Sequence, residues 1–535
     1  MMNVLKTSLY NKFYYDFLKA TDGTLKYLLP YTPDAISDVC RAIAAGSDVH
    51  RQMKEVLAQQ NLNYQSAKAK DYLSQLADPN SMIIITGQQL GFLLTPIYTI
   101  YKAITTVKLA EHMNGLNTGF RFIPVFWLET EDHDFEEIRH AGIWDRNMKP
   151  LLISYAGQDR LRTSIRHYEL DDKIVEAVTK IQQEMLESEF TERLFSRLRD
   201  HYRTGRSWID ATLDLFRELF ADSGLLFFEP GTADVKKIGG AFFEQWLIHI
   251  GKVNASFSRL TSRLELDGYP AQVPDIPGKS FLHFEDEMLQ RQHIYHENGN
   301  YYLKDRPEKW SQDGLIKILR SEPQRFSTAV ASRPPLQSWL LPVAGYVAGP
   351  AEIAYWAQLR DIFNVMNIPF PVVYPRLSAT LIEPKIARFI DKHHADISHA
   401  PLKMKDFVDT YFAQNQMDTD RFKQWRSTIE STFSEITDYI KKVDPTLVPV
   451  AAKTGQRIEG QVEQLENRLL QAVEQKEQTL ISHLEQIHTA IFPLEQPQER
   501  FVSVVYYLNK YGSDFVNRLI ENLELDPKQH QILNL

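Results

Sequence analysis

Cysteine is nearly absent from this sequence, and positive charge is not in excess. The 535 residues include one cysteine, Cys40, which excludes an intramolecular disulfide framework and any metal site built from several cysteines. The formal net charge is -9, so nonspecific binding to nucleic acid is not expected to be the main activity. Cys40 lies in a helical pattern of small and apolar residues, and we expect it to be a packing residue rather than a nucleophile.

Long apolar segments are also scarce. The most membrane-like stretch, Leu340 to Leu359, contains two prolines, two glycines and Glu352. These residues would break a helix in lipid and carry a carboxylate into hydrocarbon, so we expect no membrane span. Met1 to Thr7 lack the apolar core of a signal peptide. We therefore expect a cytoplasmic protein whose partners include neither a membrane nor a nucleic acid.

What is present is an alternation of strand-like and helical segments. Hydrophobic residues make up 43% of the chain and charged residues 24%, which is typical of a globular protein with two or three domains. Five apolar segments alternate with helical patterns: Met82–Ile85, Phe122–Leu128, Leu225–Phe228, Trp339–Ala344 and Pro371–Arg376. This alternation predicts an α/β fold with a doubly wound, mostly parallel sheet in residues 1–386, interrupted by subdomains at about 150–210 and 250–325.

The last third of the chain has a different pattern. Two apolar stripes with helical spacing, Phe422 to Val443 and Ile458 to Ile491, are separated by Asp444-Pro445. They predict an antiparallel coiled-coil hairpin within residues 387–495, which buries its stripes within itself or against a second copy of the chain. Residues 496–535 are expected to pack back on the core.

Two polar turns follow the first two predicted strands. Thr86-Gly87-Gln88-Gln89-Leu90-Gly91 follows the first strand, and the second ends in Glu129 to Glu137, where six of nine residues are carboxylates. Because open α/β sheets bind ligands at the carboxyl ends of their strands, we expect both turns to face one pocket. A glycine turn before a helix can present backbone N–H groups to a phosphate, and Gly349-Pro350-Ala351-Glu352 offers a second such turn.

The acidic turn has other interpretations. It could be a solvated helix start in which Asp132 or Asp134 is the cap, and His133 could serve only to bridge the turn to the next strand. His133, Glu137 and His140 would share a helical face, but the two histidines are seven residues apart, so no zinc site is expected. Magnesium held by carboxylates and a nucleotide suits these residues better.

Several blocks occur together along almost the whole chain: Thr86 to Gln89, Pro96 to Lys102, Val125 to Asp134, Val330 to Gln337, Gly349 to Trp356, and Gln498 to Arg500. In combination they resemble the bacillithiol biosynthesis cysteine-adding enzymes, the cysteine ligase BshC family. The resemblance implies a Rossmann-like core, a coiled-coil domain through which two copies associate, and ADP binding. It also implies ligation of L-cysteine to glucosaminyl-malate, which yields bacillithiol.

The expected chemistry follows from the substrates. An amide does not form spontaneously from a free carboxylate in water, so we expect ATP or ADP with Mg2+ as cofactors, although the sequence leaves the need for ATP open. The candidate catalytic residues are Glu131, Asp132, His133 and Asp134, with His133 as the base that takes a proton from the attacking amine. Nearby carboxylates could instead keep His133 charged at rest, and it would then act as an acid.

The candidate substrate-binding and nucleotide-binding residues are drawn from the glycine turns and from the family blocks. They are Thr86, Gly87, Gln88, Gln89, Tyr98, Lys102, Arg333, Gln337, Gly349, Glu352, Tyr355 and Arg376. Within them, Lys102 and Arg376 are expected to be charge partners of a phosphate. Two alternatives remain open: a nucleotidyltransferase or metal-dependent hydrolase that uses the same acidic turn, and a coiled-coil scaffold without enzymatic activity.

Overall fold

The computed structural model describes residues 10–43, 47–157, 161–304, 306–414 and 421–535, which form two compact units. The larger unit holds residues 10–381 and 496–533, and the smaller unit holds residues 382–495 with Asn534 and Leu535. No helix in these ranges has the length and apolar character needed to cross a membrane.

A five-stranded parallel sheet organises the larger unit. Its strands are β1 (Ser81–Gln88), β2 (Arg121–Leu128), β5 (Leu226–Phe228), β11 (Val343–Ala348) and β12 (Val372–Pro375), in the order β12-β11-β1-β2-β5. Every neighbouring pair is parallel. Counted from β5, this is the 3-2-1-4-5 order of a Rossmann sheet, and the direction of winding reverses between β1 and β11. The prediction of a parallel α/β sheet from five apolar segments is confirmed.

The predicted strand Trp339–Ala344 begins too early in the sequence. Trp339 and Leu340 end helix α14 (Arg333–Leu340), and the strand begins only at Val343, after Pro342. Leu340 is buried on the helix, so its apolar character reflects helix packing rather than membership of the sheet. A continuous apolar run does not distinguish these two states.

Helices cover the sheet with apolar sides. Helix α6 (Tyr98–Gly115) connects β1 to β2, and α3 (Pro33–Ile43) packs beside it in one buried cluster with strands β1, β2, β11 and β12. Cys40 is fully buried in that cluster, and burial raises the pKa of its thiol to about 12, which confirms a packing role. Helix α10 (Trp208–Leu219) places Phe216 against Phe126 of β2, with ring centroids 4.7 Å apart.

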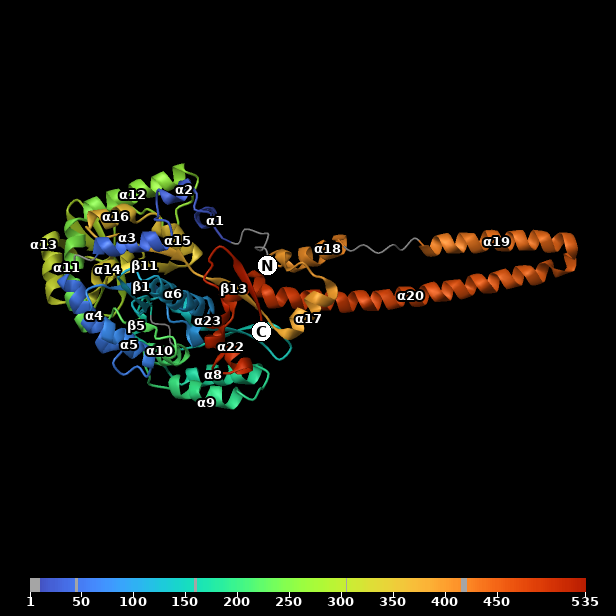
Figure 1. Ribbon diagram of the computed structural model, residues 1–535, viewed down its shortest axis with the longest axis horizontal. Helices are drawn as coiled ribbons and strands as arrows, with labels where there is room; N and C mark the ends of the chain where they lie inside the picture. Colours follow the sequence, from blue (N-terminus) through green and yellow to red (C-terminus); the bar gives the residue numbers. More distant parts are fainter. Residues whose placement is uncertain (1–9, 44–46, 158–160, 305, 415–420) are drawn as a thin grey trace. The chain divides into compact units, whose positions relative to one another are not determined.

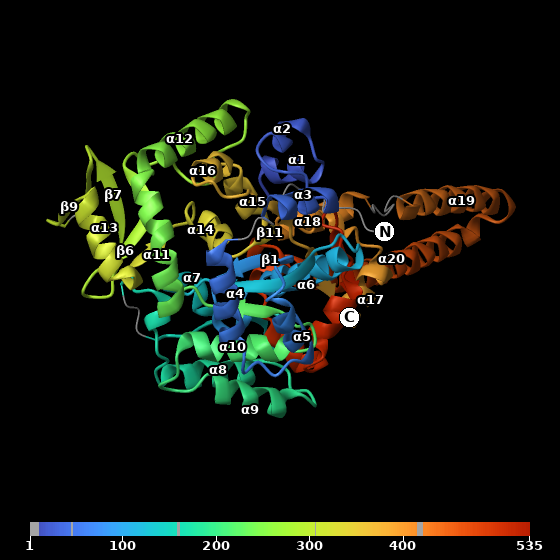
Figure 2. The same ribbon diagram turned by 60° about the vertical axis from the view of Figure 1, so that its left-hand side comes forward.

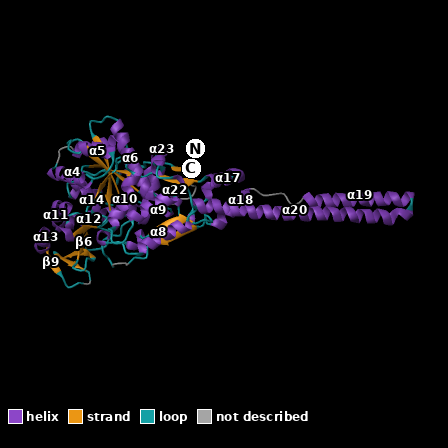
Figure 3. Cartoon of the chain, turned by 90° about the horizontal axis from the view of Figure 1, so that it is seen from below, coloured by secondary structure: helices purple, strands orange, loops and turns teal. Residues whose placement is uncertain are grey.

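The remaining elements of the core surround this sheet. Before β1 lie α1 (Lys12–Leu18), α2 (Asp22–Leu25), α4 (Asp48–Gln60) and α5 (Ala67–Gln75); between β2 and α10 lie α7 (Phe135–Ile138), β3 (His140–Trp144), β4 (Pro150–Ser154), α8 (Lys173–Glu184) and α9 (Thr191–His201). After β11 come α15 (Pro350–Trp356) and α16 (Arg360–Val365); β13 (Ser378–Ile382) follows β12. Figure 3 shows the sheet strands fanned out among these helices.

A second sheet is inserted between β5 and β11. Its strands are β6 (Lys279–Glu285), β7 (Arg291–Glu297), β8 (Asn300–Leu303), β9 (Lys309–Ser311) and β10 (Phe326–Thr328), in the antiparallel order β10-β6-β7-β8-β9. Helices α11 (Ala233–Ile248), α12 (Ile250–Leu266) and α13 (Gln312–Ser321) accompany it (Figure 2). Trp246 of α11 donates its indole N–H to Ser280 O at 2.8 Å, which ties the helix to the sheet.

The smaller unit is helical. It contains α17 (Pro384–His393), α18 (Met404–Gln414), α19 (Arg421–Val443) and α20 (Val448–Ile491), and Figure 1 shows α19 and α20 side by side. Asp444 to Leu447 join these two helices, and Gly455 of α20 lies against the ring of Phe433 of α19.

The C-terminal residues 496–533 belong to the larger unit. They form α21 (Gln498–Phe501), α22 (Val504–Tyr511), α23 (Phe515–Asn522) and most of β14 (His530–Asn534). Ile97 at the start of α6 donates its N–H to Val502 O at 2.8 Å, so this segment contacts the helix that follows β1.

Candidate active site

A cavity of about 460 Å³ lies at the carboxyl ends of β1, β2 and β11. Both glycine turns and the acidic turn contribute to its wall, as expected for the point where the winding of a Rossmann sheet reverses. The predicted site residues that line it are Gly87, Gln88, Gln89, Tyr98, Lys102, Asp132, His133, Arg333, Gly349, Glu352 and Arg376. The placement of the two turns at one pocket is therefore confirmed.

Lys102 joins the two glycine turns. Its side chain is 1% exposed, and its ammonium donates to Gly87 O, to Gln88 Oε1 at 3.3 Å and to Glu352 Oε2 at 2.6 Å. Glu352 also accepts from the Gly349 N–H at 2.8 Å. An ammonium has three donors, and all three are used within the protein. Gly87 and Gln88 are the last two residues of β1, and α6 begins only at Tyr98, so the predicted glycine turn directly before a helix is not formed there. Lys102 therefore holds the end of β1 to the turn after β11, and its ammonium group is not available as a phosphate ligand.

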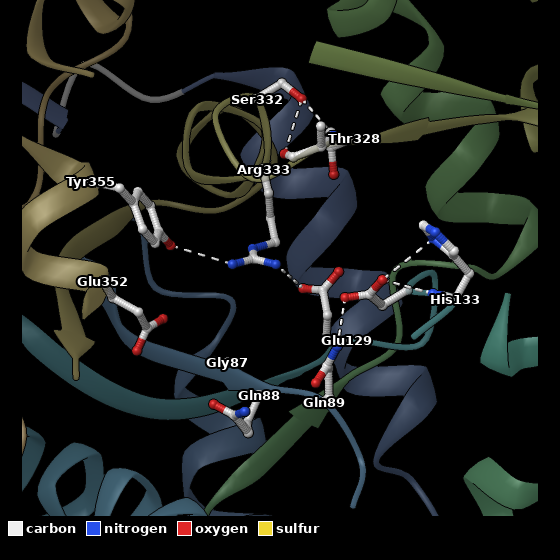
Figure 4. Close-up of polar contacts among 12 residues, drawn as sticks. Gly87, Gln88, Gln89, Glu129, His133, Thr328, Ser332, Arg333, Glu352 and Tyr355 are labelled. Carbon is white, nitrogen blue, oxygen red and sulfur yellow. Dashed lines mark hydrogen bonds and ion pairs between the residues drawn. The ribbon is translucent and has the colours of Figure 1, made fainter. Parts of the chain in front are cut away.

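Arg333 and Glu129 form a second pair in the cavity. Arg333 Nη1 lies 2.9 Å from Glu129 Oε2, and Nη2 donates to the Tyr355 hydroxyl at 3.3 Å; Figure 4 shows the guanidinium between these two side chains. Burial raises the pKa of Glu129, although Arg333 opposes this shift. Glu129 was not among the candidate residues. The available signal was its position, since it is the first residue of the acidic turn after the strand.

Asp132 connects the two polar turns. It accepts from Gln89 Nε2 at 2.7 Å and from the His133 N–H at 2.7 Å, and Arg291 Nη1 lies 3.5 Å away. Burial alone would raise the pKa of Asp132, but Arg291 and these hydrogen bonds lower it below its usual value. A carboxylate in this position stays ionised and fixes the geometry of the turn.

His133 faces the cavity as a neutral imidazole. Burial lowers the pKa of His133, and Arg291 lowers it further against the opposing charge of Asp132. Its Nδ1 lies 3.4 Å from Arg291 Nη1 and 3.6 Å from Asp132 Oδ1. A guanidinium only donates hydrogen bonds, so Nδ1 accepts from Arg291 in the tautomer in which Nδ1 carries no proton. In the other tautomer Nδ1 carries the proton, and rotation of the ring toward Asp132 favours it. The lowered pKa of His133 argues against the alternative in which nearby carboxylates keep it charged at rest.

Three candidate residues lie beside the cavity rather than on its wall. Thr86 donates its hydroxyl to Val347 O at 2.9 Å, inside the sheet. Glu131 is buried against Lys236 of α11, and Asp134 accepts from the Glu137 N–H at 3.2 Å as the cap of α7. Sequence alternation explains the difference: Glu131 and Asp132 point to different sides of the turn, and only Asp132 reaches the cavity.

Gln337 and Tyr355 are also behind the wall. Gln337 is buried on α14, and Tyr355 reaches the site only through its contact with Arg333. Arg376 does line the cavity, but its Nη2 lies 2.6 Å from Glu499 Oε1 and its Nη1 donates to Leu377 O at 2.8 Å. Burial alone would raise the pKa of Glu499, but Arg376 lowers it to about 2, so this pair is charged and fixed.

The inserted sheet supplies residues that sequence reasoning missed. Lys279 and His283 of β6, and Arg291 and His293 of β7, line the cavity together with the glycine turns. His283 and His293 are register partners, with ring centroids 4.0 Å apart, and His283 lies 6.2 Å from His133. Their spacing in the sequence carries no motif, because antiparallel pairing alone brings them together. In the described ranges, no group of three or more histidine, cysteine or acidic residues has the geometry to hold a metal ion.

Comparisons with known proteins agree with this architecture. Residues 1–377 match the N-terminal Rossmann-like domain of bacillithiol biosynthesis BshC, and residues 379–535 match its C-terminal coiled-coil domain. Three relatives, each named "Putative cysteine ligase BshC", come from Bacillus licheniformis, Salinibacter ruber and Bacillus cereus. They are 29%, 31% and 30% identical to this chain over 90%, 92% and 85% of its length, and over 90%, 91% and 85% of their own. The chain therefore belongs to the BshC family of bacillithiol biosynthesis.

Proposed function

We propose that this protein is a cysteine ligase that joins the carboxyl group of L-cysteine to the amine of glucosaminyl-malate. The observation that carries the proposal is the cavity at the sheet reversal point, where an ionised carboxylate, a neutral histidine and two glycine turns converge. A scaffold protein would not need to keep such groups buried, because their burial costs free energy. The names of the relatives support the same reaction.

The cysteine carboxylate needs activation, and ATP with Mg2+ would supply it: the carboxylate would displace ADP or pyrophosphate from ATP and become a mixed anhydride, from which the amine then displaces the phosphate or AMP. The residues present fit a nucleotide. Gly87 lines the cavity, and Gln89 Oε1 is buried with no hydrogen-bond donor in the described part of the chain. Arg500 also lines the cavity and has no carboxylate partner among the described residues. We assign Gly87 and Gln88 to the phosphate end, with Arg500 as the nearby positive charge. Gln89 Oε1 would accept from a hydroxyl or amino group of the nucleotide, because an amide oxygen cannot donate to a phosphate.

Lys102 and Glu352 support this end of the cavity. Their ion pair fixes the Gly87 end of β1 and the Gly349 turn relative to each other, so this part of the cavity wall is held in place before ligands arrive. The amine of glucosaminyl-malate enters from the side of β2 and approaches Asp132 and His133.

His133 takes the proton from the attacking amine. A neutral imidazole can do so, and Asp132 stabilises the imidazolium that forms because its carboxylate lies 3.6 Å from Nδ1. This role requires the tautomer in which Nδ1 carries its proton toward Asp132 and Nε2 faces the amine. Glu129, which is paired with Arg333, lies beside the same space, where its carboxyl group can accept a hydrogen bond from the substrate amine.

We further propose a cytoplasmic homodimer that associates through α19 and α20. Several apolar side chains of these helices and their connection are exposed in the single chain: Ile436, Tyr439, Val443, Leu447, Val450 and Leu465. Burying them against a second copy would remove apolar surface from water.

The experiment that tests the reaction is incubation of the purified protein with L-cysteine, glucosaminyl-malate, ATP and Mg2+, followed by mass spectrometry. The expected product has the mass of the two substrates less one water. Reactions without ATP and reactions with a His133→Gln variant serve as controls. Cleavage of ATP without the amide product, or nucleotidyl transfer to the sugar, would contradict the ligase proposal.

A further inference from the structure

Most cations of the cavity wall are paired with carboxylates. Lys102 pairs with Glu352, Arg333 with Glu129, Arg291 with Asp132, and Arg376 with Glu499. Among the described residues that line the cavity, Lys279 and Arg500 are the cations for which no carboxylate lies within ion-pair distance. They come from different parts of the chain: Lys279 begins β6 of the inserted sheet, whereas Arg500 lies on α21.

The surroundings of Lys279 contain unused hydrogen-bonding groups. His283 is 4% exposed; its ring lies beside the Thr328 backbone, but neither ring nitrogen makes a hydrogen bond of good geometry within the described part of the chain, and Nδ1 of His293 makes none there either. Buried polar atoms are rarely left without a partner, because each such atom costs about 1–3 kcal/mol. Both rings line the cavity, so a ligand can reach them.

The two imidazoles are neutral. Burial is the largest cause that lowers the pKa of His283 and of His293, and Arg291 lowers both further. A neutral imidazole carries one N–H donor, so this wall offers two single donors beside the ammonium of Lys279. Arg291 is committed elsewhere, since its Nε donates to Ser327 Oγ at 2.9 Å and its Nη2 donates to Thr328 O.

We propose that Lys279, His283 and His293 form the subsite that binds the carboxylates of the malate group of the acceptor substrate. This inference rests on the proposed ligase function and adds which wall of the cavity receives which part of that substrate. The malate group carries two carboxylates on a short carbon chain, and Lys279 compensates one charge while the imidazole N–H groups donate to the oxygens. The glucosamine amine then extends toward His133, whose ring centroid lies 6.2 Å from that of His283.

A carboxylate suits this wall better than a phosphate does. The wall is an antiparallel pair of β-strands whose register shifts between Lys279 and His283, and the groups that favour phosphate, a glycine turn and a bidentate arginine, lie elsewhere or are occupied. The nucleotide phosphates therefore belong at the Gly87 turn, and the two anionic ligands are kept at opposite ends of one cavity.

The test is direct binding of free L-malate to the full-length protein by isothermal titration calorimetry, with inorganic phosphate as the competing probe. A Lys279→Gln variant should bind L-malate roughly 10-fold to 100-fold more weakly, because it loses a charge-assisted hydrogen bond. Lys309→Gln is the matched control, since Lys309 is an exposed residue of the same sheet and does not line the cavity. It should bind L-malate as the unmodified protein does.

Steady-state kinetics provide the second measurement. Lys279→Gln should raise the KM for glucosaminyl-malate with little change in kcat or in the KM for L-cysteine and ATP. His293→Gln, at a half-buried position, should act in the same direction. A purely structural role would instead change all of these constants together.

The outcomes separate this inference from the ligase proposal. Binding of L-malate that depends on Lys279, without formation of the amide, would support the subsite and contradict the ligase. Amide formation with an unchanged KM in Lys279→Gln would overturn the subsite and leave the ligase intact. Absence of measurable L-malate binding to the unmodified protein, or displacement of L-malate by phosphate at this site, would also overturn the subsite.

Discussion

The ion pair between Lys102 and Glu352 should be the most sensitive point of the active-site scaffold. Lys102 is 1% exposed and Glu352 is 19% exposed, so neither charge is hydrated well enough to stand alone. Tyr346 also donates its hydroxyl to Glu352 at 2.6 Å. Breaking a buried pair by removing one partner costs about 3–5 kcal/mol, because the other charge is left uncompensated.

We therefore expect Glu352→Gln and Lys102→Met each to lower the free energy of unfolding by about 3–5 kcal/mol. In the double variant neither charge remains, so the loss should be smaller than the sum of the two single losses by about 1–3 kcal/mol. Glu111→Gln is the matched control on the same helix. Its pair with Lys68 is exposed, at 39% for each side chain, and should contribute less than about 1 kcal/mol.

The assay is urea unfolding followed by tryptophan fluorescence. Seven of the eight tryptophans lie in the larger unit and only Trp425 lies in the smaller one, so the signal reports mainly the unit that contains the pair. The single variants should also bind nucleotide more weakly, because the Gly87 and Gly349 turns lose their connection. Additive losses within about 0.5 kcal/mol would refute the reasoning, since additivity means that the two charges do not interact.

Four further predictions concern proton transfer by His133, the pH dependence of activity and of stability, and the helices α19 and α20. His133→Gln should keep the fold and lower turnover by roughly 10²–10⁴-fold at saturating substrates, and near-normal turnover would exclude proton transfer by His133. Because the pKa of His133 is lowered, kcat/KM should stay level above pH 6.5 and fall only below it; a rise on acidification would show that His133 acts as an acid. For His293 the folded pKa is about 4 against 6.5 unfolded, so the unfolded state binds more protons between these values. Stability to urea should fall as pH drops through that window, and His293→Gln should reduce the fall. Deleting α19 and α20 should convert a dimer into a monomer in light scattering, and an unchanged dimer would remove this role from the arm.

The parallel core was predictable because its strands are buried on both faces. Such strands appear in the sequence as continuous apolar runs, and the polar turns that follow them mark the carboxyl edge of the sheet. The same rule predicts that the turns containing Gln89 and Asp132 face one pocket, and Gln89 Nε2 lies 2.7 Å from Asp132 Oδ2. Where the rule failed, at Trp339 and Leu340, a buried helix produced the same apolar run.

Side-chain roles were harder to predict than positions. The sequence suggested that Lys102 and Arg376 would meet a phosphate, because both are cations near glycine turns. Lys102 instead reaches a carboxylate 250 positions away, and Arg376 reaches one 123 positions away. Nothing local distinguishes a cation that binds a ligand from one that binds a distant carboxylate, because the distinction depends on long-range pairing.

The contribution of the inserted sheet also depends on long-range pairing that the local sequence does not reveal. The pair of histidines could not be predicted from the sequence. Antiparallel strands place His283 and His293 side by side, and no fixed sequence spacing indicates that arrangement. The central sheet supplies the edge at which Rossmann-type proteins bind ligands, and that part is common to many functions. Groups from outside the central sheet must then select between substrates. In this protein these groups are the ammonium of Lys279, which has no carboxylate partner among the described residues, and two neutral imidazoles. The inserted sheet, rather than the parallel one, should therefore determine which acceptor is bound.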